Sequence, residues 1–337
     1  MTANHAVVMR NLVIALIIVA GLPCLADPLR LDTAALPPGE RYQPPATVQV
    51  IWQATNDLPK ALWVYRVIPQ TFPTAVITNL LAIGHLQATD AAKPPSNLSP
   101  DRNLMYFRDK KTTRNHSLLI APALGWVQYM DQSDSARDPV EGVPDDAKVE
   151  TLALDCLLRL GIDRSLLADK PRSRYPAVQG KLDSHRQKLT EEVFQRGISF
   201  VRRVDGVPDA GKSFWIEFGN RGKIKRFELV WRNLSPHQIR ALASPDEVIA
   251  LIREGRAVAP MQDFDWTASL HATQLTITDV RLYYFDRPGM QPLDFMYPYA
   301  ELELAAHFGT NTSTFYLTCP ILSSNTASTA KEESAQH

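Results

Sequence analysis

Residues 206–213 match the pattern G-x-x-x-x-G-K-S of the loop that binds the phosphates of ATP or GTP. That chemistry needs a strand before the loop and a helix after it, because backbone N–H groups at the helix N-terminus bind the phosphate. Residues 214–218, which read FWIEF, are strand formers, and Pro208 lacks one of the required N–H groups. We therefore expect a hairpin loop with a solvated Lys212 and no nucleotide site.

A pair of carboxylates offers a second kind of chemistry. Asp263 and Asp265 stand beside Trp266, and two acids in a cleft are the apparatus of glycoside hydrolysis. The other interpretation is a solvated loop anchored by one aromatic residue. Both interpretations stay open, and the first defines one candidate function, a secreted hydrolase that acts on carbohydrate.

No other motif predicts catalysis or metal binding. The chain has no G-x-S-x-G elbow and no Cys-x-x-Cys pair. The histidines stand singly, at His85, His116, His185, His237, His271 and His307 among others. We therefore assign no catalytic, cofactor-binding or metal-binding residue and no cofactor, although a site built from distant residues stays open. Cys156 and Cys319 fit either a disulfide or two buried small side chains.

Three helices are predicted from apolar spacing and capping signals. They begin near residues 73, 144 and 245, with Gly84 expected to take the left-handed cap of the first. Ser235-Pro236 and Ser244-Pro245 both open a capping box, which predicts one further short helix near 235. Strands are expected at 47–54, 61–67, 104–108, 117–121, 126–130, 198–204, 214–218, 224–231, 275–285, 300–306 and 314–318. Residues 170–188 are basic and show no clear period.

This order of elements predicts an α+β fold of about three helix-plus-antiparallel-β-meander units. The predicted units are an N-terminal α+β unit at 48–142, a central unit at 143–234 and a C-terminal unit at 235–322. A Pro-rich lead-in at 27–47 precedes them, and a small, polar stretch at 323–337 is expected to be a disordered tail.

The first 26 residues have the order of a signal peptide. The apolar run from Leu12 to Leu22 is shorter than the roughly 20 residues that cross a bilayer as a helix, and Ala26 supplies a small residue at the cut. We expect cleavage before Asp27 and a secreted or periplasmic protein with no stable membrane span. The chain has 36 basic and 36 acidic residues, so it lacks the basic excess typical of a nucleic-acid binder.

Residues 200–208 (FVRRVDGVP), followed by IEFG at 216–219 and GKIKR at 222–226, resemble PepSY-like and YycI-type domains of exported bacterial proteins. Residues 277–284 (ITDVRLYY), followed by YPY at 297–299, resemble the next such domain. The resemblance extends over about residues 143–317. It implies PepSY-like central and C-terminal units and regulatory or inhibitory binding to a partner, and it brings no catalytic residues.

The sequence thus favours an exported, non-catalytic binding or regulatory protein over the hydrolase. The expected partner is an exported protein or another cell-envelope macromolecule, bound at an exposed sheet surface. Four strand aromatics supply candidate contacts, and we expect at least half of them to be buried: Trp215, Trp231, Tyr283 and Tyr284.

Overall fold

The largest sheet has eight strands, and each strand is antiparallel to its neighbours. In spatial order they are β4 (Ala91–Ala92), β5 (Met105–Arg108), β6 (His116–Ala121), β7 (Trp126–Asp131), β13 (Ile224–Val230), β12 (Phe214–Phe218), β9 (Lys188–Phe200) and β8 (Ser173–Leu182). The computed structural model describes residues 39–69, 71–95, 103–109, 116–131, 139–182, 188–211, 213–260, 271–286 and 292–323. The predicted signal peptide therefore lies outside the described residues.

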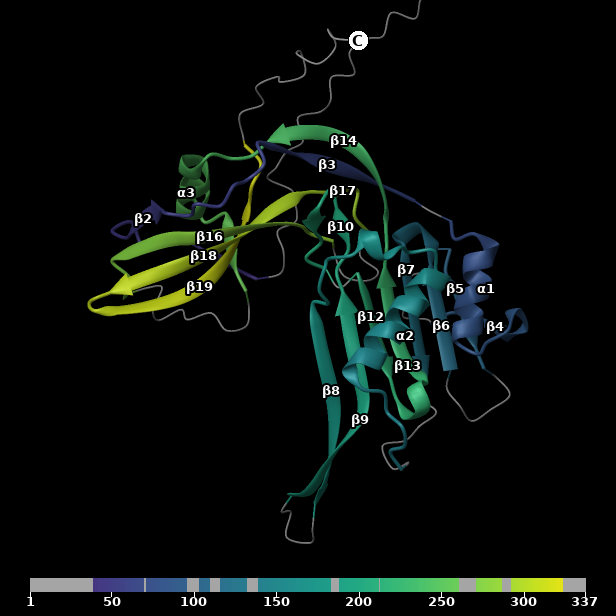
Figure 1. The fold of residues 1–337 in the computed structure, drawn as a ribbon. Coiled ribbons are helices and arrows are strands. Elements are labelled where there is room, and N and C mark those ends of the chain that lie inside the picture. Colours follow the sequence, from purple (N-terminus) through teal and green to yellow (C-terminus); the bar gives the residue numbers. More distant parts are fainter. Residues whose placement is uncertain are drawn as a thin grey trace, which may run out of the picture. The chain divides into compact units, whose positions relative to one another are not determined.

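Two helices, α1 (Thr74–Ile83) and α2 (Asp146–Arg159), lie over one face of this sheet (Figure 1). The strands alternate, so that Phe214, Ile216 and Phe218 of β12 point toward the helices and are buried. Val149 and Leu157 of α2 fill the space between helix and sheet. We call the other face of the sheet the open face.

The ends of α1 and α2 follow local rules. Asp145 caps α2 by accepting a hydrogen bond from the N–H of Lys148, and Gly161 (φ 78°) follows its last turn. The prediction for α1 was wrong in one detail. Gly84 keeps a negative φ, and His85 takes the left-handed conformation instead (φ 50°).

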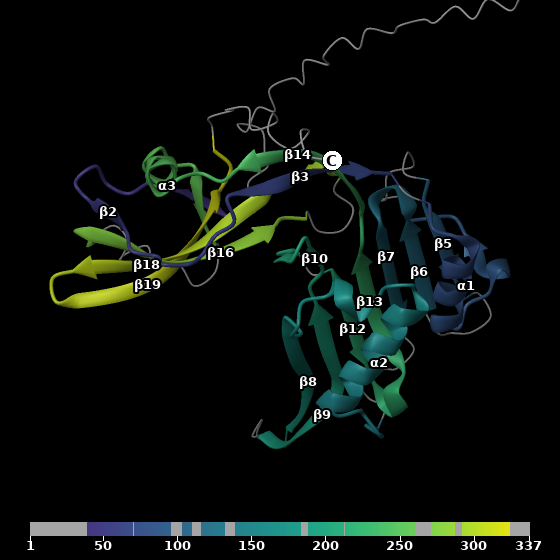
Figure 2. The same cartoon turned by 45° about the horizontal axis from the view of Figure 1, so that its top comes forward.

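The second sheet has six strands. Their spatial order is β1 (Glu40–Tyr42), β15 (Ala257–Ala259), β19 (Asn311–Pro320), β18 (Pro298–Phe308), β16 (Gln274–Tyr284) and β2 (Gln49–Trp52). Strand β2 pairs with β16 in parallel, and the other pairs are antiparallel. Helix α3 (Pro245–Arg253) lies beside this sheet (Figure 2) and buries Val248 and Ile252 in its core. The capping box predicted at Ser244 and Glu247 is present.

Two smaller sheets complete the described structure. The three-stranded sheet has the order β14 (Asn233–Ala241), β3 (Ala61–Ile68) and β17 (Phe295–Met296). Strands β10 (Arg203–Val204) and β11 (Val207–Pro208) form a short hairpin around Gly206. No helix within the described residues is both long and apolar enough to span a membrane.

The predicted architecture of three helix-plus-meander units was wrong. The structure is β-rich, with several antiparallel sheets and three α-helices among the described residues. The helices lie where they were predicted, but the strands pair between distant segments: β7 pairs with β13, and β2 with β16. Pairing across the chain merges the expected meanders into shared sheets, and α1 and α2 cover one sheet together.

Two local predictions also failed. Ser235 and Pro236 lie in β14, not at a helix start, because residues 233–241 pair with β3 along its whole length. A bulge between Pro236 and Gln238 accommodates the proline, which has no N–H to donate. Residues 173–182, expected to be unpatterned, form β8, an edge strand paired with β9.

Candidate functional site

The phosphate-loop look-alike is followed by a strand, as predicted. Gly206 (φ 79°) turns the β10–β11 hairpin, and β12 begins at Phe214, so no helix N-terminus faces the loop. Asp209 of this loop is buried, at 2% exposure, which the sequence did not suggest. Lys212 lies outside the described residues.

The predicted carboxylate pair also falls outside them. Asp263, Asp265 and Trp266 belong to a segment that the structure does not describe. The hydrolase interpretation of these residues therefore stays a prediction.

The histidines and cysteines of the described segments are dispersed. His116 Nε2 lies 2.9 Å from Asp131 Oδ1, and Lys225 Nζ lies 3.4 Å from Asp131 Oδ2. Cys156 and Cys319 are buried free thiols in the cores of different sheets, and burial raises the pKa of each to about 12. In the described part of the chain, no three His, Cys, Asp or Glu residues group as metal ligands would.

The four strand aromatics divide evenly. Tyr283 and Tyr284 are buried, whereas Trp231 and Trp215 are half-buried, which confirms that at least half are core residues. Trp231 packs against the core beneath the helices. Trp215 lies on the open face, because it alternates with the buried Phe214 and Ile216 along β12.

Trp215 belongs to a row of three stacked side chains from three strands. Tyr175 of β8 stacks beside it, with ring centroids 6.2 Å apart and planes inclined by 24°. The guanidinium of Arg226, on β13, lies 4.5 Å from the centroid of the Trp215 ring. We call Tyr175, Trp215 and Arg226 the aromatic ladder. A glycine makes room for it, since a Cβ on Gly197 of β9 would overlap the Tyr175 ring.

Two carboxylates hold the aromatic side chains of this face in place. The Tyr175 hydroxyl donates to Glu217 Oε1 at 3.2 Å, and Trp126 Nε1 donates to Glu228 Oε1 at 2.7 Å. Burial, reinforced by the charge of Glu217, raises the pKa of Tyr175 far above its ordinary value. The hydroxyl is therefore a hydrogen-bond donor at any physiological pH, and the ring orientation is fixed.

The aromatic ladder lies on the face of the sheet opposite to the helices. Both helices of this part of the chain contribute to the core on the opposite face. The sequence indicated Trp215 by its strand pattern but did not indicate Tyr175, since β8 itself was not predicted. Arg226 could not be identified from the sequence, because its stacking depends on the register of β12 and β13.

A buried charge cluster lies where the β10–β11 hairpin meets the end of β16. Arg232 donates from Nε to Asp286 Oδ1 at 2.6 Å, with side chains only 1% and 4% exposed. Asp209 Oδ1 accepts from the N–H groups of Gly211 (2.9 Å) and Asp286 (3.3 Å). Arg202 donates to the carbonyl of Arg232 at 2.7 Å. The buried charge cluster, Arg202, Asp209, Arg232 and Asp286, holds the hairpin against β16.

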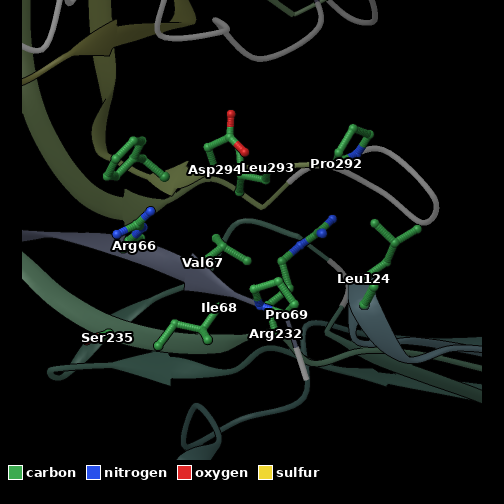
Figure 3. A pocket seen from close by; sticks show the side chains of 12 residues that line it. Arg66, Val67, Ile68, Pro69, Leu124, Arg232, Ser235, Pro292, Leu293 and Asp294 are labelled. Atoms are coloured by element: carbon green, nitrogen blue, oxygen red, sulfur yellow. The ribbon is translucent and has the colours of Figure 1, made fainter. Parts of the chain in front are cut away.

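A cavity of about 810 Å³ lies beside β3 and β17 (Figure 3). Its walls are largely apolar, with Val67, Leu124 and Leu293 among them. Asp294 is the one carboxylate among the described residues that line it, and the Arg232 guanidinium there is already bound to Asp286. The described lining therefore lacks the two facing carboxylates that glycoside hydrolysis requires.

Comparison with known proteins adds a distant structural likeness. No family model matches the chain, and no curated protein matches it. A solved structure, an uncharacterized protein from Eubacterium rectale ATCC 33656, is similar with a TM-score of 0.43 and 11% sequence identity. The match covers 80% of this chain and 86% of that one. The likeness is too low to support an argument about function, and the resemblance to PepSY-like domains stays a prediction.

Proposed function

We propose that this chain is an exported, non-catalytic protein that binds another exported protein through the open face of its eight-stranded sheet. The aromatic ladder is the observation that carries the proposal. Trp, Tyr and Arg are the residue types that dominate binding energy at protein interfaces, and here they stand side by side on the face opposite to the helices.

The ladder is also preorganised for binding. Stacking and the bond from Tyr175 to Glu217 hold its side chains before a partner arrives, so little rotamer entropy is lost on association. The open face carries both signs of charge, with Arg226 between Glu217 and Glu228. Such a surface fits a partner protein with mixed polar and apolar groups better than a polyanion.

The proposal also draws on the sequence. The signal-peptide pattern supports export, and the resemblance to PepSY-like domains favours regulatory binding. The described segments hold no group of three metal-ligand residues, and the described lining of the cavity beside β3 and β17 holds no paired carboxylates.

The test is recovery and reconstitution of a complex. The mature chain is immobilised, and proteins of the native exported fraction are captured on it. The candidate partner is then purified and titrated directly against two variants of the aromatic ladder and one control variant. We expect Trp215→Ala and Arg226→Gln to weaken binding at least about tenfold, since truncation of a hot-spot residue costs about 2 kcal/mol or more.

The matched control lies on the other side of the sheet. Leu158 of α2 is 66% exposed, and Leu158→Ala should leave the affinity unchanged. Melting temperatures of all variants separate loss of contact from loss of fold. Equal affinity of every variant would contradict the proposal. Turnover of a glycan that is lost in Asp263→Asn or Asp265→Asn, with no partner recovered, would instead establish the hydrolase.

A further inference from the structure

A second, smaller cavity lies on the helix-covered side of the eight-stranded sheet. It has a volume of about 280 Å³ and is bounded by the end of α1, by α2 and by the turn between β12 and β13. All of its lining residues belong to the described segments. The volume is just below the roughly 300–1,000 Å³ typical of small-molecule sites. It suits a ligand of about one ring.

The floor of this cavity is apolar. Phe218 and Ile83 are buried core residues, and Leu152 and Ile224 are partly buried beside them. A ligand without an apolar part would make no favourable contact with this floor, so the floor favours a ligand with an apolar body.

The rim of the same cavity is basic. Four basic side chains line it, against one carboxylate, Asp155: His85, Arg159, Arg221 and Lys223. The whole chain has 36 basic and 36 acidic residues, so this local excess of positive charge is not a property of the composition. It creates a local potential that attracts anions.

The cations of the rim are available to a ligand. Arg159 pairs with Asp155 at 2.9 Å and Arg221 with Glu141 at 2.5 Å, but each of these four side chains is more than half exposed. Exposed ion pairs contribute little to stability, so replacing their carboxylates with a bound anion costs little free energy. The His85 ring and the Lys223 ammonium have no hydrogen-bond or ion-pair partner among the described residues.

We propose that this cavity is a binding site for a small organic anion with an apolar body, such as an aromatic carboxylate or phosphate monoester. The apolar body lies on Phe218, Leu152 and Ile224, and the anionic group faces Lys223 and the two arginines. Nothing in this inference depends on the open face, which lies on the other side of the sheet.

The probes are phenyl phosphate and benzoate, titrated into the full mature chain by calorimetry. Benzyl alcohol and inorganic phosphate isolate the apolar and the anionic halves of the ligand. We expect either aromatic anion to bind more tightly than both halves, and the tighter of the two identifies a phosphate or a carboxylate ligand. Affinity should fall when ionic strength rises from about 0.01 M to about 0.15 M, because the screening length shortens from about 30 to about 8 Å.

Two variants and a matched control locate the site. Lys223→Glu should weaken binding at least about tenfold, which corresponds to the loss of one charge-assisted contact. Ala82→Phe places a ring at the mouth of the cavity from an exposed position of α1 and should abolish binding. Lys60→Glu makes the same charge change at an exposed position before β3 and should have no effect.

Three results of the titrations would overturn the assignment. They are benzyl alcohol binding as tightly as the anions, inorganic phosphate binding as tightly as phenyl phosphate, and no binding of either aromatic anion at millimolar concentration. Equal effects of Lys223→Glu and Lys60→Glu would also overturn it.

Discussion

Asp209 is a carboxyl group whose burial opposes its ionisation. Desolvation, followed by the nearby charge of Asp286, raises the pKa of Asp209 from 3.8 to about 7, and Arg202 acts in the opposite direction. The two N–H groups that donate to Oδ1 also lower the pKa, but desolvation and the charge of Asp286 outweigh them. The other ionisable groups around it are Arg232, bound to Asp286, and Tyr65 and Tyr284, whose pKa values burial also raises.

The raised pKa predicts that acid stabilises this junction. A carboxyl group with a folded-state pKa above its unfolded value stabilises the fold fully below about pH 4, and this stabilisation is lost as the pH rises through about 7. Asp209→Asn keeps an Oδ1 acceptor but binds no proton. We therefore expect the wild type to gain stability from about pH 8 to about pH 5, and the variant to gain less, by up to about 3 kcal/mol.

Urea unfolding at both pH values measures this difference. The exposed Asp57→Asn is the control and should behave like the wild type. If Asp209→Asn has the same pH dependence as the wild type, Asp209 is ionised in the folded protein and the argument fails.

Sequence reasoning is least informative for such a residue. Asp209 stands in a Gly- and Pro-containing loop that is typical of a solvated turn. It is buried only because the backbone at Asp286, 77 positions later, closes over it. Nothing local to residues 206–213 signals that contact.

Among the elements, β9 contains the position that links the fold of the sheet most directly to the aromatic ladder. Gly197 lies beneath the Tyr175 ring, and a methyl group there would displace the ring from the aromatic ladder. We expect Gly197→Ala to lower the melting temperature by a few degrees and to weaken partner binding as much as Tyr175→Ala does.

A double-mutant cycle tests the shared cause of the two effects. The double variant Gly197→Ala, Tyr175→Ala should bind no more weakly than either single variant, because both remove the same stacked ring. Additive losses of affinity would mean that Gly197 acts through the backbone of β9 and not through the ladder.

Elements with strong local signals were the predictable ones. Apolar spacing from about residue 144 marked α2, and the capping box at Ser244 marked α3. The same serine-proline signal at Ser235 failed, because pairing with β3 satisfies the backbone of residues 233–241 better than one helical turn would. A capping signal lies within a few neighbouring residues, whereas the strand that pairs with a segment can lie far away in the sequence.

At the scale of the whole molecule, the first expectation concerns its start. The apolar run and Ala26 predict that the exported product begins at Asp27. Intact mass of the protein isolated from its native cells decides this, with a variant that carries a charge within the run, Val19→Lys, as a control that should not be exported. Full-length protein in the membrane fraction would contradict the prediction.

The arrangement of the sheets could not be predicted from the sequence either, because it depends on contacts between distant segments. Alternation in β12 and β13 is consistent with a sheet that has one apolar face. It does not specify which strand lies next to which. The pairing of β7 with β13 joins residues about 100 positions apart, at an entropic cost that no short pattern records.

The two buried cysteines give this protein one thiol in each of its main cores, because Cys156 lies under the eight-stranded sheet and Cys319 in the six-stranded one. Only the thiolate reacts with an alkylating reagent, and with each pKa at about 12 neither side chain offers one while its core is closed. The sequence has one further cysteine, Cys24, which lies in the predicted leader. The relative alkylation rates of Cys156 and Cys319 therefore report which of the two cores opens first and whether they open together.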